Sequence, residues 1–173
     1  RNGDEIPTGH SNSEWESLST GAYAVYDDDP SNAEIYGNLY NWYAIDLETG
    51  VCPEDWHVPT DGEWQELVNY LGGSSIAGGK MKECTEGSCP ESEYWNSPNT
   101  GATNGSGFTG LPGGFRNMSG AYVYMGSDGY FRSSSEYNSS QAWFHSLYYG
   151  NSVVYRDFNI NKHSGLSVRC VGD

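Results

Sequence analysis

The clearest pattern of polar and apolar positions predicts a helix over 61–71. Thr60 is followed three residues later by Glu63, the spacing of a capping box at a helix N-terminus. Two glycines at 72–73 end the pattern. Between these signals the apolar residues recur at helical spacing; they are Trp64, Leu67, Val68 and Leu71.

The pattern before this helix is more mixed. The first 20 residues are mainly polar, and we expect a lead-in that is loosely attached to the rest. Alternation over 21–26 predicts a first strand, and the acidic, turn-rich segment 27–32 predicts a loop. Apolar residues at helical spacing predict another helix over 35–45, despite Gly37.

Two segments lack a regular period. Residues 50–59 contain two prolines and predict extended coil, in which we expect Trp56 and Val58 to point inward. Residues 72–107 are rich in glycine, asparagine and serine and predict a long irregular loop. Four tryptophans lie in apolar blocks and are predicted core residues: Trp42, Trp56, Trp64 and Trp143.

After Phe108 the pattern changes to short apolar segments separated by turn residues, which predicts a run of antiparallel strands. The segment 165–171 is the predicted closing strand, and we expect Arg169 on it to pair with a carboxylate. Two helices followed by strands indicate the α+β class. No repeat or linker divides 21–173, so we expect one domain there.

Composition narrows the possible functions. The chain has 173 residues, with 23 acidic and 8 basic side chains and a formal net charge of −15. Nucleic acid and anionic membrane surfaces would repel it, and no apolar run suffices for membrane insertion. Aromatic residues make up 14%, which indicates a packed protein. We expect an exported or surface-exposed bacterial protein whose signal peptide has been removed.

The four cysteines support an oxidising compartment. Cys84 and Cys89 enclose four residues, a loop that can close into a disulfide, and we predict that bond. Cys52 and Cys170 either form a second disulfide or remain as buried thiols. The spacings of a zinc site are missing.

Candidate catalytic and metal-binding groups are weak. His57 is interpreted as a structural imidazole, and the serines at 133–135 lack the surroundings of a nucleophile elbow. The carboxylates at 27–29 leave a calcium loop open, but the spacing differs from that of an EF-hand. We expect no cofactor, with calcium as the one alternative.

Several unusual blocks resemble the Fibrobacter succinogenes major paralogous domain over residues 20–173. They include YGNLYNWYAI (36–45), CPEDWHVPTDGEW (52–64), WNSPNTGATNGSGFTGLPGGFRN (95–117) and SGLSVRCV (164–171). That family occurs in exported bacterial proteins and lipoproteins. It resembles the C-type lectin-like fold, in the branch of the formylglycine-generating enzymes. The resemblance implies two helices packed on a small twisted antiparallel sheet with long loops.

The resemblance does not imply the enzyme's activity. Formylglycine-generating enzymes bind copper through a pair of cysteines near the C-terminus, and here the C-terminal third contains only Cys170. The EPN, QPD and WND motifs of calcium-dependent sugar binding are also missing. We therefore expect a protein without catalytic residues.

The segment 144–164 is the best candidate for a binding surface, because tyrosine offers rigid contact area while serine and asparagine adapt their hydrogen bonds. Between Phe144 and Asn161 there is no Lys, Glu, Gln, Met or Trp. These types cannot arise when the adenines of AAC codons are randomised. The chain therefore resembles variable proteins of diversity-generating retroelements. An ordinary tyrosine-rich strand pair would show the same depletion.

We expect many of the diversified positions to be exposed together, because buried positions do not tolerate randomisation. The residues between them should be buried, namely Trp143, Leu147, Val153 and Val168. The predicted ligand-binding residues are Phe144, Ser146, Tyr148, Tyr149, Asn151, Ser152, Tyr155, Asp157, Phe158, Asn159, Asn161 and His163.

The sequence thus predicts a non-enzymatic recognition module that binds a protein or a glycan at a cell surface. Two alternatives remain: an enzyme related to the formylglycine-generating group, and an inert module of a larger surface or pilus protein. An enzyme should have a concave pocket with convergent titratable groups. A binding module should have an open patch of tyrosine, asparagine and serine.

Overall fold

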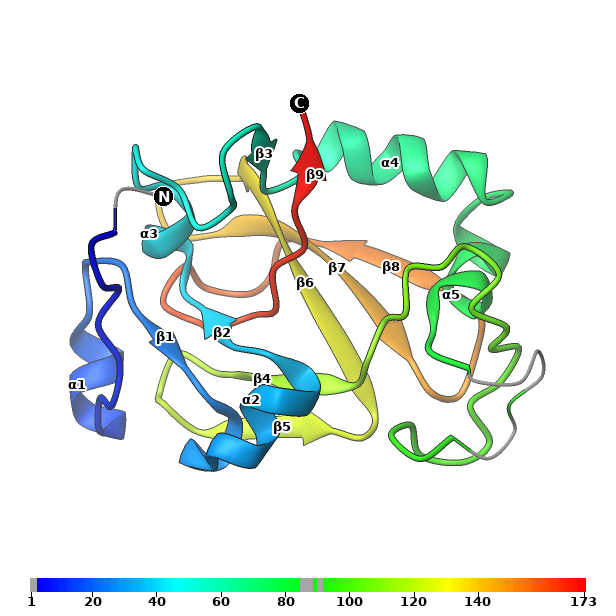
Figure 1. Ribbon diagram of the computed structural model, residues 1–173, viewed down its shortest axis with the longest axis horizontal. Coiled ribbons are helices and arrows are strands. Elements are labelled where there is room, and N and C mark those ends of the chain that lie inside the picture. Colours follow the sequence, from blue (N-terminus) through cyan, green and yellow to red (C-terminus); the bar gives the residue numbers. More distant parts are fainter. Residues whose placement is uncertain (1–2, 85–88, 90–91) are drawn as a thin grey trace.

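The computed structural model describes residues 3–84, 89 and 92–173 (Figure 1). It is a mixed α+β structure, as predicted. The helices are α1 (Asn12–Ser17), η1 (Tyr26–Asp28, a 3-10 turn), α2 (Pro30–Tyr36), α3 (Trp42–Ile45), α4 (Asp61–Tyr70) and α5 (Ser74–Met81). The strands are β1 (Tyr23–Ala24), β2 (Leu39–Tyr40), β3 (Trp56–His57), β4 (Gly113–Arg116), β5 (Tyr122–Met125), β6 (Asp128–Glu136), β7 (Ala142–Tyr148), β8 (Val154–Asp157) and β9 (Val171–Gly172).

The central sheet has the strand order β5-β4-β6-β7-β8. Its neighbours are antiparallel except β4 and β6, which are parallel and meet at Gly114 and Gly129. Two further pairs, β1-β2 and β3-β9, are antiparallel. The predicted closing strand is shorter than expected. Residues 165–167 make only isolated bridges, such as the one between Leu166 and Tyr40, 168–170 are in no strand, and β9 begins at Val171.

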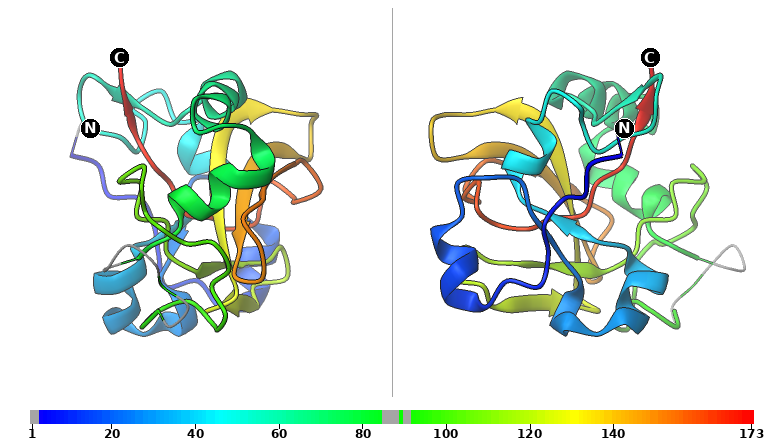
Figure 2. Two further views of the ribbon diagram at one scale, coloured as in Figure 1. Left: turned by 90° about the vertical axis from the view of Figure 1, so that its right-hand side faces the viewer. Right: turned by 60° about the vertical axis from the view of Figure 1, so that its left-hand side comes forward.

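The helix predicted over 61–71 is confirmed as α4. The Glu63 backbone N–H donates to Thr60 Oγ1 over 3.3 Å, and the Thr60 N–H donates to the Glu63 carboxylate over 2.8 Å. Helices α4 and α5 lie on one side of strands β6, β7 and β8 (Figure 2). The largest apolar cluster fills the space between them.

The helix predicted over 35–45 is wrong. Gly37 has φ 75°, which ends α2 and separates it from α3. The Asn41 side chain then accepts the Ala44 N–H over 3.0 Å and starts α3 as a new, short helix. Helix α2 begins earlier, at Pro30 inside the predicted acidic loop, because Asp29 caps it through the Ser31 N–H.

Helix α5 lies in the segment that was predicted to be irregular. Its sequence, SSIAGGKM, has two glycines and no clear apolar period, so the pattern is typical of a loop. The glycines allow close packing against the end of the sheet. A Cβ atom on Gly78 would lie 2.6 Å from the Val153 carbonyl oxygen, and one on Gly79 would lie 2.3 Å from that of Gly101.

The N-terminal segment is more firmly attached than the sequence suggests. Trp15 on α1 is fully buried, and the Arg116 guanidinium lies 4.4 Å from the centre of its ring. Arg116 also donates to the His10 carbonyl oxygen over 2.8 Å. The Tyr23 N–H donates to the Pro7 carbonyl oxygen over 3.0 Å. One tryptophan and one arginine therefore hold a segment whose other residues are mainly polar.

Other single residues also differ from expectation. Trp56 is 46% exposed, because β3 pairs only with the short β9 at the edge of the molecule. Trp143 is half-buried, whereas Trp42, Trp64 and Val58 are buried as predicted. Arg169 is exposed and donates to the Thr109 carbonyl oxygen over 3.0 Å, and it forms no ion pair with a carboxylate in the described part of the chain.

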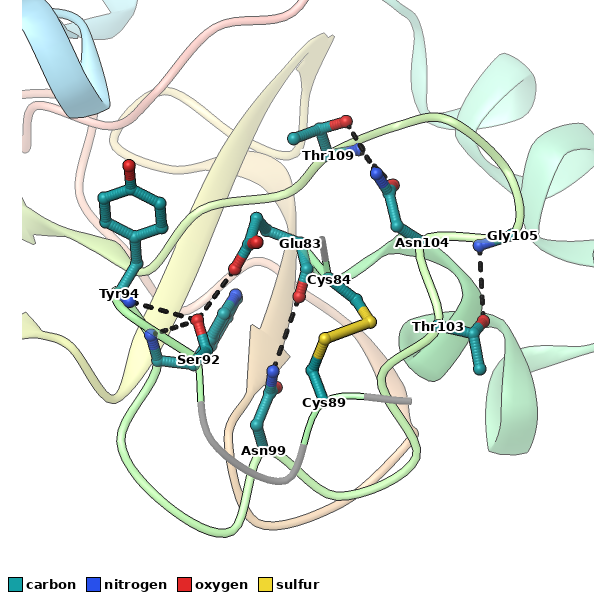
Figure 3. The surroundings of a disulfide bond; sticks show 11 residues. Glu83, Cys84, Cys89, Ser92, Tyr94, Asn99, Thr103, Asn104, Gly105 and Thr109 are labelled. Atoms are coloured by element: carbon teal, nitrogen blue, oxygen red, sulfur yellow. Dashed lines mark hydrogen bonds between the residues drawn. A yellow bond between two sulfur atoms is a disulfide. The ribbon is translucent and has the colours of Figure 1, made fainter. Parts of the chain in front are cut away.

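Both pairs of cysteines form disulfides. Cys52–Cys170 joins the segment before β3 to the segment before β9. Cys84–Cys89 lies in the long loop after α5 (Figure 3). Near it, Ser92 Oγ donates to the Glu83 carboxylate over 2.7 Å. In the described part of the chain, no helix could cross a membrane and no cluster of three or more His, Cys, Asp or Glu could hold a metal.

Candidate ligand-binding groove

The two faces of the central sheet have different surroundings. Side chains alternate between the faces of a strand. On one face, Phe131, Leu147 and Val154 pack against α4 and α5. On each of these strands, the residues directly before and after them therefore point to the opposite face of the sheet. Helices α4 and α5 do not cover that face.

The open face carries a groove with a volume of about 470 Å³. The ladder brings its walls together, since Ser146 on β7 faces both Tyr130 on β6 and Tyr155 on β8. The lining combines six aromatic rings with two carboxylates and a few small polar groups. The lining residues are Phe115, Tyr124, Asp128, Tyr130, Phe144, Ser146, Tyr148, Tyr155, Asp157, Asn159 and Ile160.

Four of the rings form a connected aromatic cluster. The ring centres of Phe115 and Tyr130 are 4.7 Å apart, and Tyr130 and Phe144 are 5.9 Å apart. Tyr124 stacks on Phe115 with 6.0 Å between centres and is 56% exposed. Contacts of this kind hold the rings in fixed orientations, so the aromatic surface of the groove is largely formed before a ligand arrives.

Two carboxylates lie at the groove. Asp128 at the start of β6 accepts the Ser127 hydroxyl over 2.7 Å, and burial raises the pKa of its carboxyl. Asp157 at the end of β8 accepts the backbone N–H of Phe158 over 2.7 Å through Oδ1. Burial, helped by the negative charge of Asp128, also raises the pKa of the Tyr130 hydroxyl well above its usual range. Tyr130 is therefore a neutral hydrogen-bonding group at physiological pH.

Half of the predicted ligand-binding residues line this groove. Tyr148, Tyr155, Asp157 and Asn159 form its accessible part, with Tyr155 44% exposed. The other two, Phe144 and Ser146, are buried and form its floor. The expectation that these two lie on an exposed surface is wrong, because they stand in the middle of the sheet between β6 and β8.

The remaining predicted residues lie outside the groove. Tyr149 packs against the main core. Asn151 and Ser152 belong to the turn between β7 and β8. Phe158 stacks on Tyr137 with 3.7 Å between ring centres. The last two contact each other, since the His163 N–H donates to the Asn161 side chain over 3.0 Å.

Four residues between the variable positions were expected to be buried, and one of them is. Leu147 is 1% exposed, as predicted. Trp143, Val153 and Val168 are half-buried. Trp143 is partly covered by the Arg156 guanidinium, which lies 3.7 Å from the centre of one of its rings.

Sequence reasoning missed five lining residues: Phe115, Tyr124, Asp128, Tyr130 and Ile160. Four of them belong to β4, β5 and β6, which precede the segment that attracted attention. The alternation of Asp128 and Tyr130 with buried Gly129 and Phe131 was the available signal. It indicates two faces of a strand, but it does not tell which face stays uncovered.

A buried lysine supports the groove from behind. Lys82 is fully buried, and its ammonium lies within 3.1 Å of the carbonyl oxygens of Thr100, Tyr148 and Asn151. Tyr148 is the last residue of β7, and Asn151 lies in the turn that leads to β8. Burial lowers the pKa of Lys82 to about 8, so the ammonium is still mainly protonated at pH 7. It therefore fixes the hairpin that carries half of the groove.

The other candidate groups lie apart from the groove. His145 is buried on the helix-covered face, where it stacks on Trp64. His57 is held between Glu63 and Asp173, which agrees with a structural role. Another hollow of about 490 Å³ lies between the N-terminal segment and 47–51, and no aromatic ring lines it. The aromatic groove is therefore the better candidate site.

These features describe a disulfide-bonded α+β domain with a preformed aromatic and acidic groove on one face of its sheet. Comparison of sequences places the chain in a family: residues 1–172 match the Fibrobacter succinogenes major domain. The chain belongs to this family, as its sequence blocks indicated. No curated protein and no solved structure gives a significant match.

Proposed function

We propose that this domain is a non-enzymatic recognition module of an exported or surface-exposed bacterial protein, and that it binds a protein or glycan ligand in the aromatic groove. The main support is the convergence of six predicted ligand-binding residues on one hollow. The two disulfides are compatible with an extracellular location. The family membership adds no function of its own.

The proposal includes a C-type lectin-like fold. Its support is the packing of α4 against a small, mainly antiparallel sheet, followed by a long loop that the Cys84–Cys89 disulfide braces. The segment before β9 returns to the centre of the molecule, where Leu166 bridges to Tyr40 and Ser167 bridges to Phe131. An experimental structure with a different strand order would contradict this part of the proposal.

Diversification of the groove by a retroelement is also part of the proposal. Within the groove, we expect free variation at the accessible positions Tyr148, Tyr155, Asp157 and Asn159. The gene tests this directly. We expect NNC codons at these positions, a nearby near-copy of the region with AAC codons, and a reverse-transcriptase gene. Ordinary codons without a template copy would refute diversification and leave the groove as an invariant site.

Binding is tested with ligand arrays and matched variants. Tyr155→Ser removes an exposed groove ring, and Tyr70→Ser removes a ring that is 87% exposed on α4. We expect hits on a glycan or peptide array to weaken in the first variant and to persist in the second. Equal binding by both would show that the groove is not the site.

The same preparations test the enzymatic alternative. Two carboxylates in an aromatic groove also occur in glycoside hydrolases, so the protein should be incubated with nitrophenyl glycosides. We expect no release of nitrophenol above the blank. Turnover that Asp128→Asn abolishes would overturn the non-enzymatic proposal, as would copper-dependent oxidation of a cysteine-containing peptide.

A further inference from the structure

The charges around the groove are all of one sign. Its lining contains Asp128 and Asp157 and no lysine, arginine or histidine. Among the described residues neither carboxylate takes part in an ion pair. Within the described ranges each also keeps one oxygen without a hydrogen bond, since Ser127 donates only to Asp128 Oδ2 and the backbone donors reach only Asp157 Oδ1.

The nearby cations Arg156, Lys82 and Arg132 do not line the groove. Arg156, next to Asp157 in sequence, points to the helix-covered face and binds Asp61 over 2.7 Å. Lys82 is surrounded by carbonyl oxygens behind the hairpin. Arg132 is fully buried, donates to the Ser164 carbonyl oxygen over 2.8 Å and does not line the groove. Among the described residues, therefore, no cation of the chain itself forms an ion pair with the two groove carboxylates.

The aromatic rings add to the same preference. The face of a phenyl or phenol ring is electronegative and attracts a cation that lies within about 6 Å of its centre. Tyr124 on β5 and Tyr155 on β8 are exposed at the two edges of the sheet, and Phe115 and Tyr130 lie between Tyr124 and the floor. A neutral sugar could stack on these rings, but it would leave two half-buried negative charges uncompensated.

We propose that the groove binds a cationic side chain, an arginine or lysine presented by a basic segment of a partner protein. The carboxylates compensate its charge, and the rings contact its alkyl stem and charged head. The net charge of −15 steers a basic partner toward the domain. The inference rests on the proposed function, since it names the ligand class of the same groove.

The test uses four acetylated and amidated pentapeptides, Gly-Gly-X-Gly-Gly, in which X is Arg, Lys, Gln or Glu, together with methyl glucoside. Each is titrated into the whole chain while backbone amide signals are followed by NMR. We expect the Arg and Lys peptides to shift signals of β6, β7 and β8 in a saturable way. They should bind at least fivefold more tightly than the Gln peptide, and the Glu peptide should cause no shift.

Matched carboxylate variants separate the groove from the general acidity of the protein. Asp128→Asn and Asp157→Asn each remove one negative charge from the groove, and Glu66→Gln removes one from the exposed surface of α4. We expect each groove variant to bind the Arg peptide about fivefold or more weakly, whereas Glu66→Gln should change the affinity by less than twofold. Equal weakening by all three would overturn the inference, because it would show non-specific attraction.

The outcomes also distinguish this inference from the proposed function. If methyl glucoside shifts groove signals and the Arg peptide does not, the groove is a binding site and the cationic ligand is wrong. If a ligand from the arrays binds elsewhere and no compound shifts groove signals, both are wrong. If the protein binds the Arg peptide more tightly than the Gln peptide, and if this preference requires Asp128 and Asp157, both the inference and the proposed function are supported.

Discussion

The two faces of the central sheet are both aromatic, but their surroundings differ. On the helix-covered face Trp64, Phe108, Phe131 and His145 pack together beneath α4. On the open face a comparable cluster forms around Phe115 and Tyr130, and α4 and α5 lie on the other side of the sheet. The rings alone therefore do not distinguish core from binding surface. The difference lies in the carboxylates beside the rings. Asp61 on the helix-covered face pairs with Arg156, whereas Asp128 and Asp157 on the open face take part in no ion pair among the described residues.

The sharpest test of this comparison removes one large side chain from each face. Leu147→Ala, on the helix-covered face, should lower the free energy of unfolding by about 2–5 kcal/mol, because it leaves a cavity in a closed core. Tyr155→Ala, on the open face, should lower it by less than about 1 kcal/mol. Urea unfolding followed by tryptophan fluorescence measures both. Similar losses would show that the open face is also a closed core.

Lowering the pH should destabilise the protein through His145, which is buried on the helix-covered face. Burial lowers the pKa of this imidazole to about 4, against an opposing effect of nearby Asp61. The unfolded chain, with an ordinary pKa near 6.5, then binds more protons between pH 4 and 6.5. The free energy of unfolding therefore falls as the pH drops through this window, by up to about 3 kcal/mol from this residue.

His145→Gln isolates this effect, because it removes the titrating group and leaves the others in place. The difference in stability between the two proteins should change between pH 6.5 and 4 and be constant from 7 to 8. His57 provides a contrast, since hydrogen bonds to Asp173 and Glu63 raise its pKa. Its contribution is present below pH 6.5 and is lost as the pH rises through its folded-state pKa. A pH-independent difference for His145→Gln would contradict the assignment.

The hairpin behind the open face depends on Lys82. Lys82→Met should lower the free energy of unfolding by about 1–3 kcal/mol, since it leaves buried carbonyl oxygens without a donor. Lys80→Met is the control, because Lys80 is exposed and donates to the carbonyl oxygen of Leu71 alone among the described residues. Hydrogen exchange should show faster opening of the 148–154 turn only in the first variant.

The sequence predicted those features that depend on neighbours along the chain. Thr60 and Glu63 start α4 through contacts within one turn, so their spacing was sufficient. Helix α5 was missed because Gly78 and Gly79 are explained only by their distant neighbours Val153 and Gly101. Part of the groove lining was also missed because it depends on contacts between distant parts of the chain. The tyrosines of 148–155 signalled a surface, whereas Asp128 and Tyr130 join it through strand register, which a single sequence does not specify.

The smallest expected effect compares one carboxylate on each face. Asp61 binds the Arg156 guanidinium through both oxygens, at 2.8 and 2.7 Å, so Asp61→Asn should lower the free energy of unfolding by about 0.5–1 kcal/mol. Asp128 is half-buried without an ion pair among the described residues, and its desolvation opposes folding.

Asp128→Asn should therefore leave the stability at pH 7 unchanged or raise it, by less than about 1 kcal/mol because solvent screens part of the charge. Thermal unfolding of both variants at pH 7 and low salt measures whether each substitution lowers or raises the stability. A carboxylate that weakens the fold and is nevertheless present marks a position kept for binding. A clear loss of stability in Asp128→Asn would show that this carboxylate serves the fold, as Asp61 does.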